Sequence, residues 1–315
     1  MIRLNGLQLG IVGVMFLMWF AFIVGSPETF LSRQIYRALM TSIPMWGIIA
    51  LPLTMVVIAG EIDLSFPSTM AVGMVAFFEV YSREASLGLA FAGALGAGFL
   101  VGLLNGIIIV RLKIPSLIAT IGAQFFWRGL VDIVRAGQGE SMTFTKDSLM
   151  RDMLVKKVND YFPAQVIWMV LVGILVWIIL NRHRFGAHVY LIGDNEDSAR
   201  LMGVNVGVTR IMLFALVGLA AAFAGVIQCV DTWYFYPNMG EGYLMQTLAA
   251  VFLGGTSVYG GIGTIFGTFI GCFIIGAIQP GIIAIGLDGY YTKLIYGLII
   301  TASVAMHTIV RKRLE

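Results

Sequence analysis

Long apolar runs, separated by short polar breaks, occupy almost the whole chain. Because about 20 apolar residues in a helix cross the hydrocarbon core of a bilayer, these runs predict an all-α integral membrane protein. Two prolines, Pro44 and Pro52, fall inside the second run and are expected to interrupt it, since proline removes a helical hydrogen bond. The pattern predicts about ten transmembrane helices, some of them broken, at 9–24, 36–59, 67–81, 87–110, 115–134, 163–180, 208–230, 243–253, 264–285 and 291–309.

Composition supports a membrane protein without a separate soluble domain. Hydrophobic residues make up 59% of the chain and charged residues only 12%, against about 25% in soluble proteins. We therefore interpret residues 1–315 as one transmembrane domain, with the run at 11–24 as a first span and not a cleaved signal peptide. The net charge of +3 reflects basic loops and not a nucleic-acid surface. Cys229 and Cys272 fall in apolar runs, which indicates neither a disulfide nor a metal site.

One polar segment, residues 193–206, stands out between two apolar runs. Asn195 is suited to cap a helix, because its side-chain oxygen can accept a free N–H of the first turn. Glu196 and Asp197 would follow in that first turn, where the helix dipole favours negative charge. Gly203 would end the helix, because glycine tolerates left-handed geometry. The segment predicts a short surface helix; the alternative is an ordinary solvated loop that separates two spans.

The pattern Gly-x-Asn-x-x-x-Ala-x-x-x-Gly-Val-Asn-Val in this segment resembles the cytoplasmic segment of ribose/xylose/galactoside-type permeases of bacterial ABC importers. Three further stretches resemble the same family in the same order: Gly-Glu-Ile-Asp-Leu-Ser at 60–65, Ile-Pro-Ser-Leu-Ile-Ala-Thr at 114–120 and Gly-Gly-Thr-Ser-Val-Tyr-Gly-Gly at 254–261. The resemblance implies that residues 182–208 form a coupling segment that docks on a separate ATPase. Its implied contact residues are Gly193, Asn195, Ala199, Arg200, Gly203 and Asn205.

The resemblance also implies a function. The chain would be the permease subunit of an ATP-driven importer in a bacterial inner membrane, paired as a homodimer or with a homologous permease. An extracytoplasmic binding protein would deliver a monosaccharide, and the ATPase subunits, not this chain, would use ATP. The same architecture could carry a nucleoside, a riboflavin-like heterocycle or, less readily, a branched-chain amino acid. An ion-coupled secondary transporter would need inverted repeats and a buried charged site, and no convincing repeat is present.

Basic residues predict the orientation. Ten crossings place both termini on one side, and the positive-inside rule makes that side cytoplasmic. It would hold the basic residues Arg3, Arg111, Lys113, Arg182, Arg184, Arg200, Arg210, Arg311, Lys312 and Arg313. The polar segment 135–162 would then form an outer loop, although it carries Lys146, Arg151, Lys156 and Lys157.

Polar residues in apolar surroundings are the candidates for a transport pathway. Glu61, Asp63 and Ser65 lie between two spans, where a charge should face protein, water or an interface. They line the pathway at a broken helix, or they form a plain surface turn in which Asp63 or Ser65 caps the next helix. Glu61 and Pro67 depart from the family, which usually has glycine at both positions. Asn105 and Gln124 join the pathway candidates, although Asn105, Gln124, Gln228, Gln246 and Gln279 are also typical of hydrogen bonds between helices.

Several further patterns distinguish residues that pack helices together from residues that could bind a partner or catalyse a reaction. Small residues recur every fourth position at 90, 94, 98, 102 and 106 and at 263, 267 and 271, which predicts close helix packing. The aromatic stretch 233–237 is a candidate surface for the binding protein. The sequence contains no Gly-x-x-x-x-Gly-Lys-Ser/Thr loop and no catalytic motif, so it predicts a conduit and not an enzyme, with no catalytic residues and no bound metal or cofactor.

Overall fold

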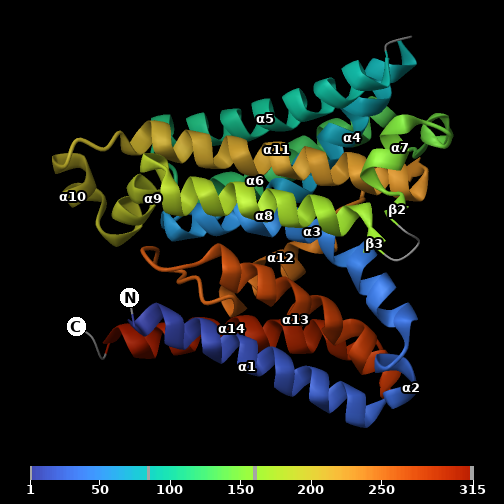
Figure 1. Cartoon of the computed structure of the whole chain (residues 1–315). Coiled ribbons are helices and arrows are strands. Elements are labelled where there is room, and N and C mark those ends of the chain that lie inside the picture. The colour runs from blue at the N-terminus through green and yellow to red at the C-terminus, as the bar shows by residue number, and fades with distance from the viewer. Residues whose placement is uncertain (1, 84–85, 159–161, 313–315) are drawn as a thin grey trace.

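All ten predicted segments are helical in the computed structural model, which describes residues 2–83, 86–158 and 162–312, with side chains from 8 to 305 within these ranges (Figure 1). The ten helices are α1 (Ile2–Gly25), α3 (Arg33–Ile58), α4 (Phe66–Ser82), α5 (Leu87–Leu112), α6 (Ser116–Arg135), α8 (Ala164–Arg182), α11 (Val206–Thr232), α12 (Tyr243–Leu253), α13 (Ile265–Ala284) and α14 (Tyr291–Lys312). Shorter helices are α2 (Pro27–Phe30), η1 (Thr143–Thr145), α7 (Leu149–Leu154), α9 (Arg184–Asp194) and α10 (Glu196–Leu201).

Within the described part of the chain, seven helices are long and apolar enough to cross a membrane: α1, α3, α5, α6, α8, α11 and α13. Helix α4 has 17 residues, α12 has 11, and the described apolar part of α14 is Tyr291–Ala305. The all-α membrane fold is therefore confirmed. The number of ten spans is approximate, because three of these helices are short for a full crossing.

The second predicted span differs from the expectation. Helix α3 continues through both Pro44 and Pro52 without interruption. Nearly nine-tenths of its apolar window is buried, so neighbouring helices support it despite the missing N–H groups. The chain breaks only after Ile58, where residues 59–65 leave the helix before α4 begins. The expected proline interruption was wrong, and the break lies about two turns beyond the second proline.

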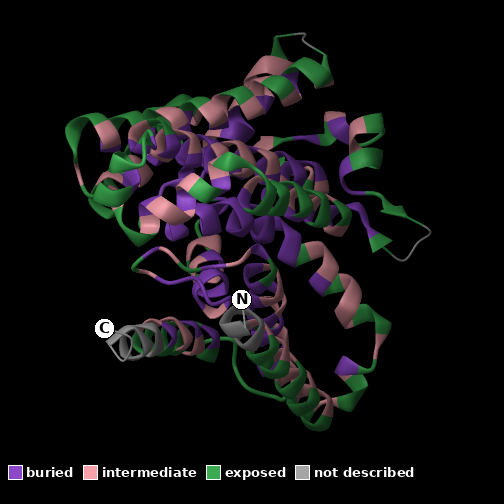
Figure 2. Ribbon diagram, turned by 60° about the vertical axis from the view of Figure 1, so that its left-hand side comes forward, coloured by how far each residue is buried: buried purple, intermediate pink, exposed green. Residues whose placement is uncertain are grey.

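Small residues bring the central helices together, as predicted. Helix α11 packs against α5, α4 and α3 and is largely buried. Figure 2 shows the buried residues gathered in the interior of the bundle. A Cβ atom added to Gly98 or Gly102 of α5 would collide with backbone oxygens of α11. On α13, a Cβ added to Gly267 or Gly271 would collide with the backbone of α12 and the turn after it. Both predicted packing faces are confirmed.

The two ends of the bundle are built differently (Figure 1). At one end α9 and α10 form a helical projection, and α1 begins and α14 ends there. At the other end α7 lies beside two antiparallel pairs: β1 (Glu140–Ser141) with β4 (Tyr234–Phe235), and β2 (Lys157–Val158) with β3 (Phe162–Pro163). The predicted loop 135–162 thus contains regular structure. Arg135 holds it to α4 through an ion pair with Glu79 (2.5 Å) and also pairs with Glu140.

Candidate functional site

Residues 182–208 contain two short helices, α9 and α10, whereas the sequence predicted one, within 193–206. Helix α10 begins after Asn195, whose side-chain oxygen accepts a hydrogen bond from Ser198 N (2.8 Å), so the predicted cap is confirmed. Helix α9 precedes it and is capped by the ring of His183, which accepts from Phe185 N (3.1 Å). The signal for α9 was an apolar face inside a polar stretch, since its Val189 and Ile192 are buried.

The end of α10 also agrees with the sequence prediction. Gly203 has φ +82°, the left-handed conformation that glycine adopts at low cost. Val204 N donates to Ala199 O (3.0 Å), which satisfies a free carbonyl of the last turn. Asn205 then caps α11, with its side chain accepting from Val208 N (3.1 Å). The turn Gly203–Asn205 is therefore built to return the chain to the bundle.

The side chains of α10 point in two directions. Ala199 is fully buried against its own chain, whereas Leu201 is 90% exposed and Met202 68% exposed. Sequence reasoning chose Ala199 for its small size and passed over the two large apolar residues beside it. An exposed Leu–Met pair at the tip of a projecting helix is typical of a surface that contacts another protein.

Backbone atoms from three distant stretches meet beside α9; we call residues 58–60, 193 and 260–261 the glycine junction. Gly261 N donates to Ile58 O (2.8 Å). A Cβ atom at Gly193 would collide with Ile58 O, and one at Gly260 would lie 2.8 Å from Gly193 O. Glycine is required here because the backbones touch directly. The junction brings three of the four family-like stretches together: the break after α3, the end of α9 and the turn after α12.

Four charged side chains form a row beside this junction, which we call the charge relay: Glu61, Arg210, Glu196 and Arg200. Arg210 Nε lies 2.6 Å from Glu61 Oε1, and Arg210 Nη2 lies 2.7 Å from Glu196 Oε2. Glu196 Oε1 then accepts from Arg200 Nη2 (2.6 Å) within α10. The hydrogen bond from Arg200, with a further one from Arg210, lowers the pKa of Glu196 below its ordinary value. The relay runs from the helix break to the exposed helix α10.

The other pathway candidates gather at the head of α4. Asp63 Oδ1 accepts from the Ser65 hydroxyl (2.6 Å) and from Ser65 N (2.8 Å). Asn105 of α5 donates to Ser65 Oγ (2.8 Å) and accepts from Trp127 Nε1 (3.1 Å). Asp63, Ser65 and Asn105 are all buried. Ser65 occupies the N-cap position of α4 but uses its hydroxyl toward Asp63, so it does not cap through its side chain.

Gln124 joins the same region from α6. Its Oε1 accepts from Ser68 Oγ (2.5 Å) and Ser68 N (3.2 Å). Ser116 Oγ accepts from Ile62 N (3.1 Å), which fixes the break against the start of α6. Four of the five pathway candidates are therefore close together at the head of α4, whereas Glu61 turns away to Arg210. Whether any of them lines a pathway stays a prediction.

Comparison with known proteins gives the family. Residues 35–304 match the family described as "Branched-chain amino acid transport system / permease component". The chain belongs to this permease family. It is 31% identical to the ribose import permease protein of Escherichia coli K12, over 89% of this chain and 87% of that protein. It is 30% identical to the fructose import permease protein of Rhizobium meliloti (96% and 85%) and 32% identical to the L-arabinose ABC transporter permease protein of Azospirillum brasilense (94% and 86%).

Arg128 is buried in this permease and was not identified from the sequence. Arg128 of α6 donates to Pro67 O (3.0 Å) and to Pro237 O, and lies 3.5 Å from Glu241. It therefore ties the head of α4 to the loop between α11 and α12. An arginine in the middle of an apolar run was the available signal, because a cation within a membrane helix needs partners.

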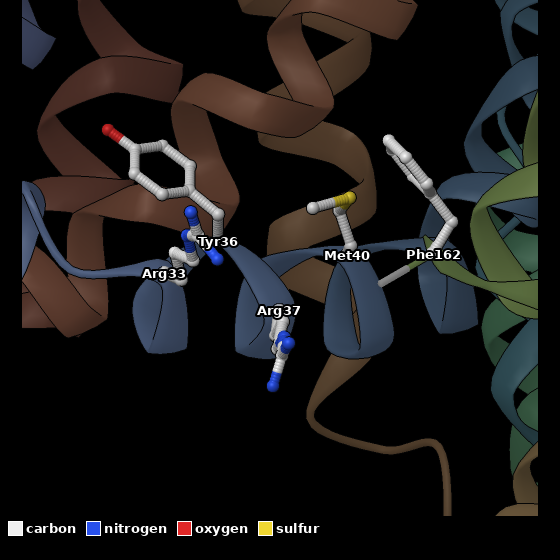
Figure 3. Close-up of a pocket in the computed structure, with 5 residues that line it drawn as sticks. All are labelled: Arg33, Tyr36, Arg37, Met40 and Phe162. Atoms are coloured by element: carbon white, nitrogen blue, oxygen red, sulfur yellow. The ribbon is translucent and has the colours of Figure 1, made fainter. Parts of the chain in front are cut away.

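The predicted aromatic surface is only partly open. In the stretch 233–237, Phe235 is fully buried, while Tyr234 and Tyr236 are exposed. A cavity of about 400 Å³ lies at the same end of the permease (Figure 3). Four of its lining residues belong to the first two turns of α3, and Phe162 comes from β3. None of the predicted site residues lines this cavity.

Proposed function

We propose that this chain is the pathway-forming permease subunit of an ATP-driven ABC importer, and that its cargo is a monosaccharide delivered by an extracytoplasmic binding protein. One observation carries the proposal: three relatives, aligned over 89%, 96% and 94% of this chain, are named for ribose, fructose and L-arabinose. The alignments also cover 87%, 85% and 86% of these three relatives, and their names agree on the cargo class while differing on the sugar.

The proposed assembly needs further subunits. The chain has no phosphate-binding loop, so ATP would be hydrolysed by separate ATPase subunits, and the chain itself would bind no cofactor. Two permease subunits, identical or homologous, would form the pathway. Helix α10 offers the ATPase an exposed apolar tip, Leu201 and Met202, on a projection that is already capped and folded.

The proposed location is a bacterial inner membrane, with α9, α10 and both termini in the cytoplasm. Helices α5 and α8 end, and α11 begins, at the end of the bundle that carries α10 (Figure 1). That end therefore gathers the basic residues of three connections, including Lys113, Arg182 and Arg210. The positive-inside rule favours a cytoplasmic position for it. The side chains of Arg3, Arg311, Lys312 and Arg313 lie outside the described ones.

Uptake in a strain that lacks this gene tests the proposed cargo. We expect the deletion to abolish binding-protein-dependent uptake of one radiolabelled monosaccharide, and a plasmid copy of the gene to restore it. Ribose, fructose, arabinose, a nucleoside and leucine form the panel. Loss of nucleoside or leucine uptake, with all sugars unaffected, would contradict the monosaccharide assignment and leave the permease family intact.

A further inference from the structure

The charge relay connects two parts of the chain that the sequence holds far apart. Glu61 lies just after α3, Glu196 opens α10, and Arg210 stands in the second turn of α11. Arg210 bridges both carboxylates, at 2.6 Å and 2.7 Å, and its own side chain is only 20% exposed. The Glu61 side chain is 11% exposed and forms an ion pair with this guanidinium.

The two ends of the relay have different surroundings. At the Glu61 end, Ile62 N donates to Ser116 Oγ, and Ser65 accepts from Asn105 and donates to Asp63. These bonds put the relay next to the polar cluster at the head of α4. At the Glu196 end, Arg200 is exposed on α10 beside Leu201. A displacement of α10 therefore moves Glu196 relative to Arg210, and Arg210 also contacts Glu61 at the helix break.

The glycine junction provides a direct backbone contact beside the charge relay. Gly193, at the end of α9, touches Ile58 O through backbone atoms, and Gly261 N binds the same oxygen. This close contact keeps the end of α9 and the break in register, and the relay adds a directional charge contact beside it.

We infer that Arg210 is a positioning residue that transmits movement of α10 to the helix break at residues 59–65, through Glu61. This inference rests on the proposed importer function. It assigns Glu61 to coupling and not to the pathway lining. An ion pair suits this role because energetic coupling between two sites can be carried by salt-bridge networks that connect rigid elements.

The test uses the whole complex of permease, ATPase and binding protein in proteoliposomes, with Glu61→Gln as the first variant. We expect the complex to assemble and to hydrolyse ATP, but to transport about fivefold less sugar per ATP hydrolysed. A merely structural defect would lower transport and hydrolysis together and leave this ratio unchanged. Glu196→Gln breaks the same relay at a more exposed residue and should give the same loss. Glu79→Gln removes an ion pair of similar length at the other end of the bundle and serves as the control.

Hydrogen exchange provides a second readout that does not depend on the cargo. In the wild-type complex, a non-hydrolysable ATP analogue should change exchange both in peptides of α10 and in the segment 59–65. In Glu61→Gln and Arg210→Gln, the change at α10 should remain and the change at 59–65 should be lost. An unchanged response at 59–65 in both variants would overturn the inference. Failure of the wild-type complex to assemble or to import any monosaccharide would instead count against the proposed function.

Discussion

Leu201 has the highest exposure, 90%, among the large hydrophobic side chains that the structure describes. It sits at the last position of α10, where the following turn lifts it away from the bundle. Burying a leucine against a partner contributes about 1.5–3 kcal/mol. In contrast, Ala199 is already buried in its own chain, so a bulky substitution there would damage α10 before any partner arrives.

Substitution of Leu201 by aspartate is therefore the sharper test of docking. We expect Leu201→Asp to lower recovery of the ATPase with the purified permease by about tenfold or more, because a charge replaces the apolar contact. Leu149→Asp is the control, since Leu149 is 76% exposed on α7 at the opposite end. Equal ATPase recovery in the two variants would show that α10 does not dock through this residue.

Gly193 illustrates a residue whose side chain is excluded by geometry alone. Its φ is not left-handed, but an added Cβ would collide with Ile58 O. We expect Gly193→Ala to destabilise the permease by on the order of 3 kcal/mol, because a backbone contact must open. Thermal unfolding in detergent measures this. Gly122→Ala is the control: it lies within α6 with nothing near its Cβ position, and it should keep or slightly raise the melting temperature.

At the scale of elements, α10 depends on its cap. A helix of six residues is marginal alone, so Asn195 and the flanking helices hold it in shape. We expect Asn195→Ala to weaken ATPase binding by about fivefold, which corresponds to a lost cap of about 1 kcal/mol. Asn181→Ala provides the matched control, because Asn181 is exposed, lies inside α8 and donates to Trp177 O of the same helix. Binding by titration of labelled ATPase distinguishes the two.

The element that the pattern described least well is the break at residues 59–65. Two prolines suggested an interruption inside the span, yet α3 stays helical through both. The chain leaves the helix later, where Gly60 adopts φ +80° and Asp63 turns back to bind Ser65 N. Local composition overstated the proline effect because it contains no information on the neighbours that support the helix.

At the scale of the whole molecule, the proposed topology makes a prediction about labelling. In a Cys229→Ala/Cys272→Ala background, Ser198→Cys should resist a membrane-impermeant maleimide in intact cells and react after permeabilisation. Ser198 is exposed on α10, so the permease itself does not bury it. Asp147→Cys, exposed at the opposite end, should react in intact cells. The reverse pattern would invert the topology.

The proposal that separate subunits hydrolyse ATP predicts that the permease alone hydrolyses none. The physical reason is the missing phosphate-binding loop, without which the chain lacks a cradle of backbone N–H groups for the phosphates. Purified permease in nanodiscs, without ATPase subunits, should show no hydrolysis above the empty-disc background. Hydrolysis that persists through repurification and co-elutes with the permease would contradict a separate ATPase.

The sequence by itself determined the family, from four short stretches in order along the chain. It also determined the helical membrane fold, the packing faces and the caps of α10 and α11, because each of these depends on residues within a few turns of one another. It also selected the residues at the head of α4, although not their bonding. Only the tertiary structure decided that Glu61 pairs with Arg210, that Gly193 touches Ile58 and that Leu201 faces outward. These contacts join positions up to 149 residues apart in the case of Glu61 and Arg210, and no local pattern specifies which distant charge or backbone group will become the neighbour.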